Sequence, residues 1–398
     1  MSKLLLIIDF PLSKNLCSGG IRYLELAQAL KTQHEVTLAG TTIEKDFDNQ
    51  GLNILKISPF KNINLGFKLT VPNKEFIEAL SNFDLVITGG GIIRSFGNLK
   101  KIKAPLLIDL YGPWFIENLA GGKTKCFKEN LKAIFDSLKA GTFFLCANEN
   151  QKDLYIGLSL AAGCNNPKIN NNIGIVPIGI SDIPPKRESG IIKGIFPGIK
   201  KSDKLIIWWS GIWSWLDPLT LIKAMAIIAT KRKDIKAAFL GVQSFEKTNQ
   251  HQQIINQSFK LAEELKIKDK FVFFINEWLP YAERDKWLID GDLGIISHND
   301  NIETRFAWRT RALDYLWANL PIVTTQGDAI AELVHKYNLG RVVPYCNPEA
   351  LSQAILELLD NQEEYQKIKQ NINAFIPNLY WKNLIGPIND FCQRLEKK

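Results

Sequence analysis

Short apolar runs recur along the whole chain, and most are followed by a segment with apolar residues at helical spacing. Runs of this kind, bounded by turn residues, are typical of parallel strands that helices cover on both faces. They form two series, separated by a Pro-, Lys- and Gly-rich segment at 183–204. We predict strands at 4–10, 35–40, 53–58, 84–90, 105–112, 142–148 and 174–180, and then at 204–211, 237–242, 270–276, 292–297, 320–325 and 340–344. We predict amphipathic helices at 21–31, 218–231, 256–265 and 348–359.

Two such series predict an α/β protein with two doubly wound, Rossmann-like parallel-sheet domains that face a central cleft. We expect the two domains at 1–190 and 200–375. The segment 376–398 has no obvious place in the second sheet, and we expect its helix to pack back on the first domain. Its apolar residues lie at helical spacing: Leu384, Ile388, Phe391 and Leu395.

Composition narrows the class of protein. The chain has 398 residues, of which 46% are hydrophobic and 23% charged, which suits a two-domain globular protein. Its six cysteines form no CxxC pair, which indicates reduced thiols rather than a disulfide framework or a zinc site. The N-terminus is typical of a first strand rather than a signal peptide, and no run approaches the roughly 18 apolar residues of a spanning helix. We therefore expect a cytoplasmic protein.

The net charge of +8 favours anionic partners. It suits anionic small molecules, and also a peripheral contact with the inner face of an anionic membrane. Nucleic acid is the less favoured partner, because no zinc-finger spacing, RNA-recognition signature or arginine-rich tail is present. We expect no nucleic-acid binding.

The segment from Glu303 to Asp328 carries the strongest chemical signal. Three arginines, Arg305, Arg309 and Arg311, lie close together in it. Like charges three or four residues apart repel on a helix, so such a cluster needs an anionic partner. Guanidinium groups match phosphate oxygens, and a helix start adds a positive dipole. We interpret the segment as a binding site for a sugar nucleotide. The alternative is a solvated helix face with internal Glu–Arg pairs.

Several predicted strand ends are rich in glycine or polar residues. Gly19 and Gly20 open a helix after the first strand, the run 89–91 is all glycine, and 109–112 reads Asp-Leu-Tyr-Gly. Glycine at such a position lets a ligand approach the backbone closely. The first of these segments is not the GxGxxG fingerprint, and no acidic residue ends the second strand. We expect no dinucleotide cofactor.

With these features in place, the chain resembles the GT-B glycosyltransferases of the family-4 type, also called group 1, nearly from end to end. SGGIRYLELAQALKTQHEVTLAG is similar to their opening unit, and CANENQKDLYIGL with VPIGI to the end of their first domain. LDYLWANLPIVTTQGDAIAELV resembles their EAMACGLPVVATDVGGIPELV region, and YWKNLIGPINDF their closing helix. The resemblance implies a retaining hexosyltransferase that uses a nucleotide-sugar donor. It also implies an acceptor-binding domain at 1–190 and a nucleotide-sugar-binding domain at 200–375.

Two departures from the family pattern affect the expected donor site. The loop 211–217, where relatives carry Arg and Lys for the diphosphate, has no basic residue, although Gly211 and Trp213 remain candidates to line the site. The second acid of the E-x7-E pair falls on Asp314, but Phe306 stands where the first acid is expected. Our hypothesis is that the three arginines replace the loop cations. Glu303 then contacts the sugar, and Asp314 the ribose.

Further roles follow from the resemblance. His298 stands near the expected sugar position, and Asp109 or Tyr111 is expected to act on the acceptor side. Retaining GT-B enzymes work without a metal, and we expect neither a metal site nor a cofactor besides a UDP- or GDP-sugar as substrate. The acceptor is left open as a lipid-linked glycan or a small molecule.

Other functions remain as alternatives. The altered loop keeps open a pseudo-glycosyltransferase that couples a non-sugar cyclitol nucleotide. A non-catalytic sugar-nucleotide-binding protein of a glycan or natural-product pathway would bind donor without turnover. A sugar-nucleotide epimerase shares the architecture, but the chain has only four histidines for acid–base chemistry.

Overall fold

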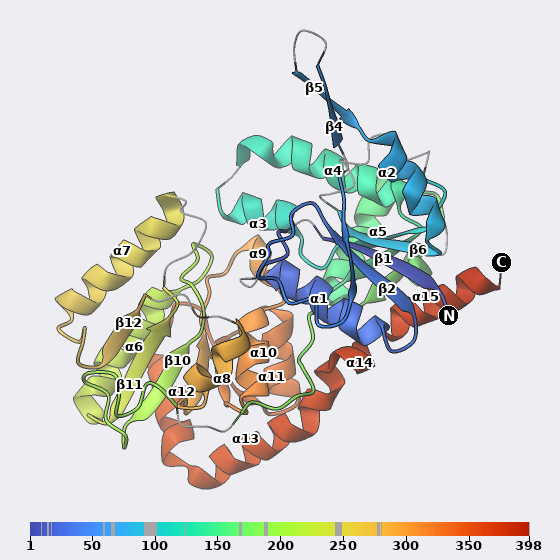
Figure 1. The fold of residues 1–398 in the computed structure, drawn as a ribbon. Helices are drawn as coiled ribbons and strands as arrows, with labels where there is room; N and C mark the ends of the chain where they lie inside the picture. The colour runs from blue at the N-terminus through green and yellow to red at the C-terminus, as the bar shows by residue number, and fades with distance from the viewer. Residues whose placement is uncertain are drawn as a thin grey trace. The chain divides into compact units, whose positions relative to one another are not determined.

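The computed structural model describes most of the chain and divides it into two compact units (Figure 1). Unit 1 comprises Met1–Leu119, Lys123–Gly179 and Tyr380–Lys398, and unit 2 comprises Ala120–Gly122 and Ile180–Leu379. The described residues are 1–8, 10–13, 16, 18–58, 60–64, 68–90, 102–122, 124–166, 169–186, 190–242, 249–276, 279 and 281–397.

Unit 1 is built on a seven-stranded parallel sheet with the order β3-β2-β1-β6-β7-β8-β9. The strands are β1 (Lys3–Ile8), β2 (Glu35–Gly40), β3 (Asn53–Lys56), β6 (Leu85–Gly89), β7 (Leu106–Asp109), β8 (Phe143–Cys146) and β9 (Ile173–Ile175). The helices that follow or cover them are α1 (Ser18–Leu30), α2 (Lys74–Ala79), α3 (Trp114–Ala120), α4 (Phe127–Ala140), α5 (Glu149–Ala161), α14 (Trp381–Leu384) and α15 (Gly386–Glu396). Short 3₁₀ turns lie at η1 (Leu80–Asn82), η4 (Thr124–Cys126) and η5 (Ile169–Asn172).

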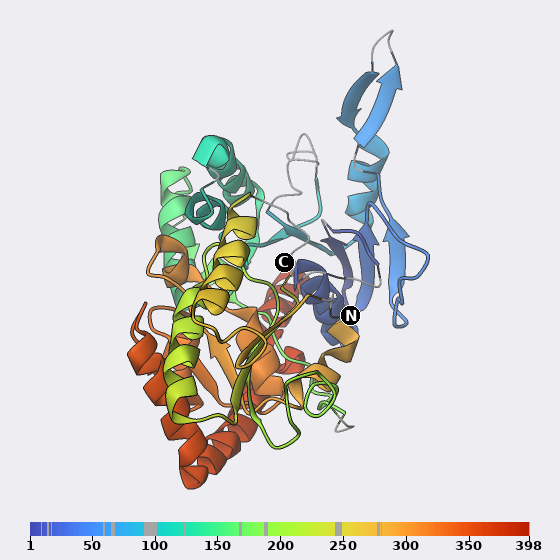
Figure 2. The ribbon, with the colours of Figure 1, turned by 90° about the vertical axis from the view of Figure 1, so that its left-hand side faces the viewer.

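A hairpin that the sequence did not predict projects from unit 1. Its antiparallel strands, β4 (Phe60–Asn64) and β5 (Lys68–Pro72), extend away from the parallel sheet in both views (Figures 1 and 2). Conversely, the strand predicted at 174–180 ends early, at Ile175, two residues before Pro177. Val176 N still donates to Cys146 O of β8, but Pro177 has no backbone N–H, which is consistent with the pairing ending there.

The C-terminal segment belongs to unit 1, although all of unit 2 precedes it in the chain. The Phe391 ring of α15 stacks on Phe143 of β8, with ring centroids 4.6 Å apart. The α15 helix also contacts the edge strand β9, where a side chain at Gly174 would collide with Pro387. Both chain ends meet here, since Ser2 donates a hydrogen bond to Glu396 (Figure 1).

Unit 2 holds a six-stranded parallel sheet with the order β12-β11-β10-β13-β14-β15. Its strands are β10 (Lys204–Trp208), β11 (Ile235–Leu240), β12 (Val272–Ile275), β13 (Leu293–Ile296), β14 (Ile322–Thr325) and β15 (Gly340–Val343). Its helices are α6 (Pro218–Lys231), α7 (Asn249–Glu264), α8 (Arg284–Leu288), α9 (Ile302–Phe306), α10 (Thr310–Trp317), α11 (Ala329–Lys336), α12 (Pro348–Asp360) and α13 (Gln362–Phe375), with 3₁₀ turns η6 (Tyr281–Glu283) and η7 (Ile376–Leu379). The prediction of two doubly wound parallel sheets is confirmed.

The order of strands reverses once in each sheet. In unit 2, β11 and β12 lie on one side of β10, and β13 to β15 on the other. In an open α/β sheet, ligands bind outside the carboxyl ends of the strands at such a switch point. The polar residues that follow β10, β13 and β14 therefore form the candidate site of unit 2.

Candidate functional site

Buried charged side chains fill the region after β13 and β14. The Arg309 guanidinium donates to both oxygens of Glu303, at 2.8 and 2.7 Å, and its Nε lies 3.1 Å from Asp328 Oδ2. His298 Nε2 is also 3.1 Å from this Asp328 oxygen. Each of the four side chains is no more than 6% exposed. We call these residues, Glu303, Arg309, Asp328 and His298, the carboxylate network.

Helix starts hold the network in place. Asn301 caps α9, and its side chain accepts hydrogen bonds from the backbone N–H groups of Glu303 and Thr304. Asp328 caps α11, because its Oδ1 accepts from Ala331 N at 2.8 Å while Oδ2 faces Arg309. Burial alone would raise the pKa of Asp328, but hydrogen bonding from His298 and the charge of Arg309 outweigh it, and this pKa is lowered.

The three predicted arginines have different surroundings. Arg305 is exposed, Arg309 is committed to two carboxylates, and Arg311 is buried with few partners. Arg309 therefore forms the internal Glu–Arg pair that is the alternative to a ligand site. The pair is buried, however, and does not lie on a solvated helix face. Of the three, Arg311 is the one with a buried donor that has no partner among the described residues.

Arg311 lies beside the loop after β10. Its Nη2 donates to the Gly211 carbonyl at 3.1 Å, and its guanidinium lies 4.7 Å from the centroid of the Trp208 ring. Nη1 is buried and has no hydrogen-bond partner among the residues that the structure describes. Burial lowers the pKa of Arg311 to about 10, with the neighbouring Arg309 adding to the effect. A buried cation with an unused donor is favourable for binding an anion.

Asp314 lies one helical turn beyond Arg311 on α10. One carboxylate oxygen lies 3.2 Å from Arg284 Nε, and the other accepts a 2.9 Å hydrogen bond from the Trp209 indole. The side chain keeps 19% of its surface exposed, so it can still contact a ligand. Tyr315 fixes the helix to the sheet, because its hydroxyl donates to Ile207 O and accepts from Trp209 N, both at 2.8 Å.

The Asp314 carboxyl should make stability depend on pH. Burial raises its pKa to about 6 from 3.8, despite the opposing effect of Arg284. The folded state therefore binds a proton more strongly than the unfolded state, so this contribution to stability is complete below pH 4 and is lost as pH rises through 6. We expect Asp314→Asn to remove that slope when the free energy of unfolding is measured in urea at half-unit steps. Parallel curves for the two proteins between pH 4 and 6 would contradict the raised pKa.

Aromatic side chains lie together in the loop that follows β10. The Trp213 and Trp215 rings are stacked, with centroids 5.2 Å apart and planes 10° from parallel. Both are half-buried. The His251 ring of α7 meets both edge-on, at 4.9 and 5.5 Å. The tryptophans in the loop thus lie outside the hydrophobic core, whereas Trp208 and Trp209 are buried.

In unit 1, Arg22 organises the predicted acceptor-side residues. It donates to both oxygens of Asp109, at 2.7 and 2.8 Å, and both side chains are fully buried. The guanidinium also lies 4.7 Å from the Tyr111 ring centroid. Asp109 raises the pKa of Arg22 although burial opposes this. Asp109 is therefore held as a paired carboxylate, and its predicted role toward an acceptor stays a prediction.

The two glycines at the start of α1 have a packing explanation. A side chain at Gly19 would reach within 2.4 Å of the Phe10 ring, and one at Gly20 within 2.9 Å of Leu16. Glycine therefore lets the Phe10 and Leu16 side chains pack closely against the start of α1. The prediction that these residues approach a ligand is untested.

Comparison with known proteins identifies this arrangement. The model of the family described as Glycosyl transferases group 1 matches residues 203–361, which include every strand of the second sheet. The protein carries a group 1 glycosyltransferase domain. It is accordingly a glycosyltransferase, and its two sheets form the GT-B fold. No curated protein matches the sequence.

Solved GT-B structures resemble the glycosyltransferase over its whole length at low identity. A glycosyltransferase from Rickettsia africae is 17% identical, with a TM-score of 0.67 over 100% of this chain and 99% of that one. HepE from Anabaena, solved in complex with UDP-glucose, is 13% identical, with a TM-score of 0.71 over 100% of both chains. Sucrose-phosphate synthase from Thermosynechococcus elongatus is 10% identical, with a TM-score of 0.70 over 100% of both.

Several residues of the glycosyltransferase site were not predicted. Arg284, His251 and Tyr315 gave no local signal, because each acts through a partner far away in the sequence. Asp328 could have been recognised: it follows the strand 320–325 and precedes an apolar helical pattern, which is the position of an N-cap.

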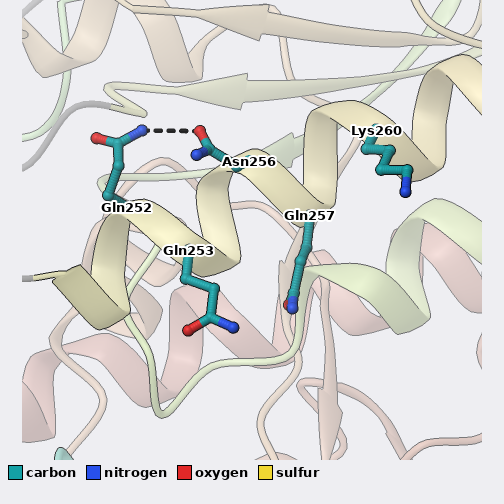
Figure 3. A pocket seen from close by; sticks show the side chains of 5 residues that line it. All are labelled: Gln252, Gln253, Asn256, Gln257 and Lys260. Atoms are coloured by element: carbon teal, nitrogen blue, oxygen red, sulfur yellow. Dashed lines mark hydrogen bonds between the residues drawn. The ribbon is translucent and has the colours of Figure 1, made fainter.

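Metal-binding clusters, membrane spans and surface hollows add little to this site. Among the described residues, no group of three His, Cys, Asp or Glu is arranged to hold a metal, and none of the described helices could cross a membrane. A hollow of about 430 Å³ is lined by Gln252, Gln253, Asn256, Gln257 and Lys260, all on α7 (Figure 3). The residues that line it are separate from the strand ends described above.

Proposed function

We propose that the protein transfers a hexose from a nucleotide sugar to an acceptor with retention of configuration and without a metal. The observation that carries this proposal is Arg311, a buried cation with an unused donor at the switch point of a group 1 domain. Charge develops on the leaving diphosphate in such a reaction, and a positioned guanidinium stabilises it. Neighbours that bind UDP or UDP-glucose favour a UDP-sugar as the donor, with no further cofactor.

The other predicted residues take positions in this proposal. Asp314 holds the ribose hydroxyls, and Glu303 and His298 of the carboxylate network stand where the sugar would lie. Arg309 acts as a positioning residue, because its guanidinium is already used by Glu303 and Asp328. Arg305 is exposed and could approach the diphosphate only from the surface.

The proton balance needs no separate base. As the acceptor hydroxyl attacks the anomeric carbon, the sugar–phosphate bond breaks, and the departing phosphate oxygen takes the acceptor's proton. Asp109 and Tyr111 would orient the acceptor, which is a lipid-linked glycan or a small molecule. The net charge of +8 is compatible with a cytoplasmic protein that visits an anionic membrane surface.

Thermal shift with a panel of UDP-, GDP-, ADP-, CMP- and dTDP-sugars tests the proposal, since a ligand that binds the native state raises its melting temperature. We expect one nucleotide to raise it, with or without EDTA. In Arg311→Met this rise should disappear, while the unliganded melting temperature stays equal or increases because an undersatisfied buried charge is removed. Arg305→Met is the matched control and should keep most of the rise.

The outcomes separate the alternatives. A rise that EDTA abolishes would contradict metal independence, and an inverted anomer in the product by NMR would contradict retention. Binding without turnover for every acceptor class tried would favour the non-catalytic protein. No rise with any donor would overturn the proposal.

A further inference from the structure

The stacked tryptophans after β10 have a geometry suited to one part of a nucleotide sugar. Trp213 and Trp215, the indole pair, face each other with nearly parallel rings, so no ligand can lie between them. Both residues are half-buried, so each remains partly accessible. A flat aromatic ligand can stack on an indole, and this contact tolerates any base.

His251 fixes the indole pair from the neighbouring helix. Its Nδ1 accepts a 3.2 Å hydrogen bond from the backbone N–H of Ser214, the residue between the two tryptophans. An imidazole nitrogen accepts only when it is unprotonated, so the bound ring carries its proton on Nε2. The ring is 4% exposed and packs edge-on against both indoles. The pair is therefore held in place without a ligand.

The indole pair and the buried cation meet at one residue. The Gly211 carbonyl accepts the hydrogen bond from Arg311, and a β-carbon on Gly211 would lie 3.6 Å from Trp213 Nε1. Trp213 thus borders the position where Arg311 could hold a phosphate. A ligand that reached both would need an anionic group next to a ring.

Aromatic rings, a buried cation and carboxylates lie at the carboxyl ends of neighbouring strands of the second sheet. The indole pair lies in the loop after β10 and packs against His251 on the helix that follows β11. Arg311 reaches the same loop from α10, and the carboxylate network follows β13 and β14. With strands about 4.8 Å apart, these groups spread over roughly 15 Å. Aromatic rings, a cation and hydrogen-bonding carboxylates occur in the same order as the base, diphosphate and sugar of a nucleotide sugar.

We propose that the donor's nucleobase stacks on the indole pair, with His251 as a positioning residue, while the sugar lies on the side of the carboxylate network. This inference rests on the proposed function and adds the assignment of the base. If the base stacks on the indole pair, the C–H face of the transferred sugar does not.

Calorimetric titration with UDP, UDP-glucose and pyrophosphate tests the assignment, with GDP and GDP-glucose in parallel. Trp213→Leu should weaken UDP binding at least tenfold, weaken UDP-glucose by the same factor, and leave pyrophosphate within twofold. Trp287→Leu, a half-buried tryptophan on α8, serves as the control and should leave all three within twofold. A loss confined to UDP-glucose would place the sugar on the indoles and overturn the proposal.

His251 is tested by a pair of variants. His251→Leu removes the acceptor for Ser214 N–H and should weaken UDP as Trp213→Leu does, whereas His251→Asn places an oxygen near Nδ1 and should recover most of the affinity. Equal losses in both variants would contradict the positioning role. If wild-type protein transfers sugar while Trp213→Leu leaves UDP affinity unchanged, only this inference fails. If wild-type protein binds none of the nucleotides, the proposed function fails with it.

Discussion

Arg309→Met is expected to cost unit 2 about 4 kcal/mol of unfolding free energy, within the range of 3–5 kcal/mol for removing one partner of a buried ion pair. The reason is that Glu303 and Asp328 would stay buried with their main cation removed. Urea unfolding followed by tryptophan fluorescence measures this, because eight of the ten tryptophans lie in unit 2.

Arg305→Met is the control for that experiment, since it removes the same charge four residues away from an exposed site. We expect a change within about 0.5 kcal/mol. Adding Glu303→Gln to Arg309→Met should recover part of the loss, because fewer uncompensated charges remain buried. Equal stability of the two single variants would mean that the network is not closed in solution.

Arg22→Met should destabilise unit 1 by about 3–5 kcal/mol for the same reason. The Arg22–Asp109 pair is bidentate and fully buried, and it joins α1 to the end of β7. Hydrogen exchange read by mass spectrometry follows this unit separately. Amides of β1, β6 and β7 should lose protection, while those of unit 2 keep it.

A double variant distinguishes the two roles of Asp109. Arg22→Met with Asp109→Leu removes both charges and should restore most of the protection, whereas Arg394→Met, an exposed arginine of unit 1, should change little. If the double variant is stable and still transfers sugar, Asp109 serves the fold. If it is stable and binds donor but no longer transfers, Asp109 serves the acceptor. Unchanged protection in Arg22→Met alone would contradict the structural importance of the pair.

The sequence predicted the architecture because the core strands carry their own signal. Strand β2 coincides with the predicted 35–40, and β6 differs from 84–90 by one residue at each end. The hairpin β4–β5 and helix α13 were missed. In α13 the only buried residues are Ile368, Ile372 and Phe375, too few among polar residues for a helical period to stand out.

The sequence identified which charged residues belong to the site, but it did not show which side chains they pair with. Arg309 was recognised as needing an anion, yet a residue pattern does not show whether that anion is a ligand or Asp328, nineteen positions away. The same holds for Asp109 and Arg22, which are separated by eighty-seven positions. Long-range pairing depends on the close packing of several elements, and the hydrophobic pattern does not specify it.

The return of α15 to the edge of the first sheet has a consequence for the nascent chain on the ribosome. Domains generally fold as they are synthesised, N-terminal first. Here Phe143 and the edge strand β9 lack their contacts with Phe391 and Pro387 until α15 has been synthesised. That happens only after Ile180–Leu379 has been made. The edge strand is exposed to wrong partners during this interval. The unit whose synthesis begins first is therefore the one whose folding is completed last.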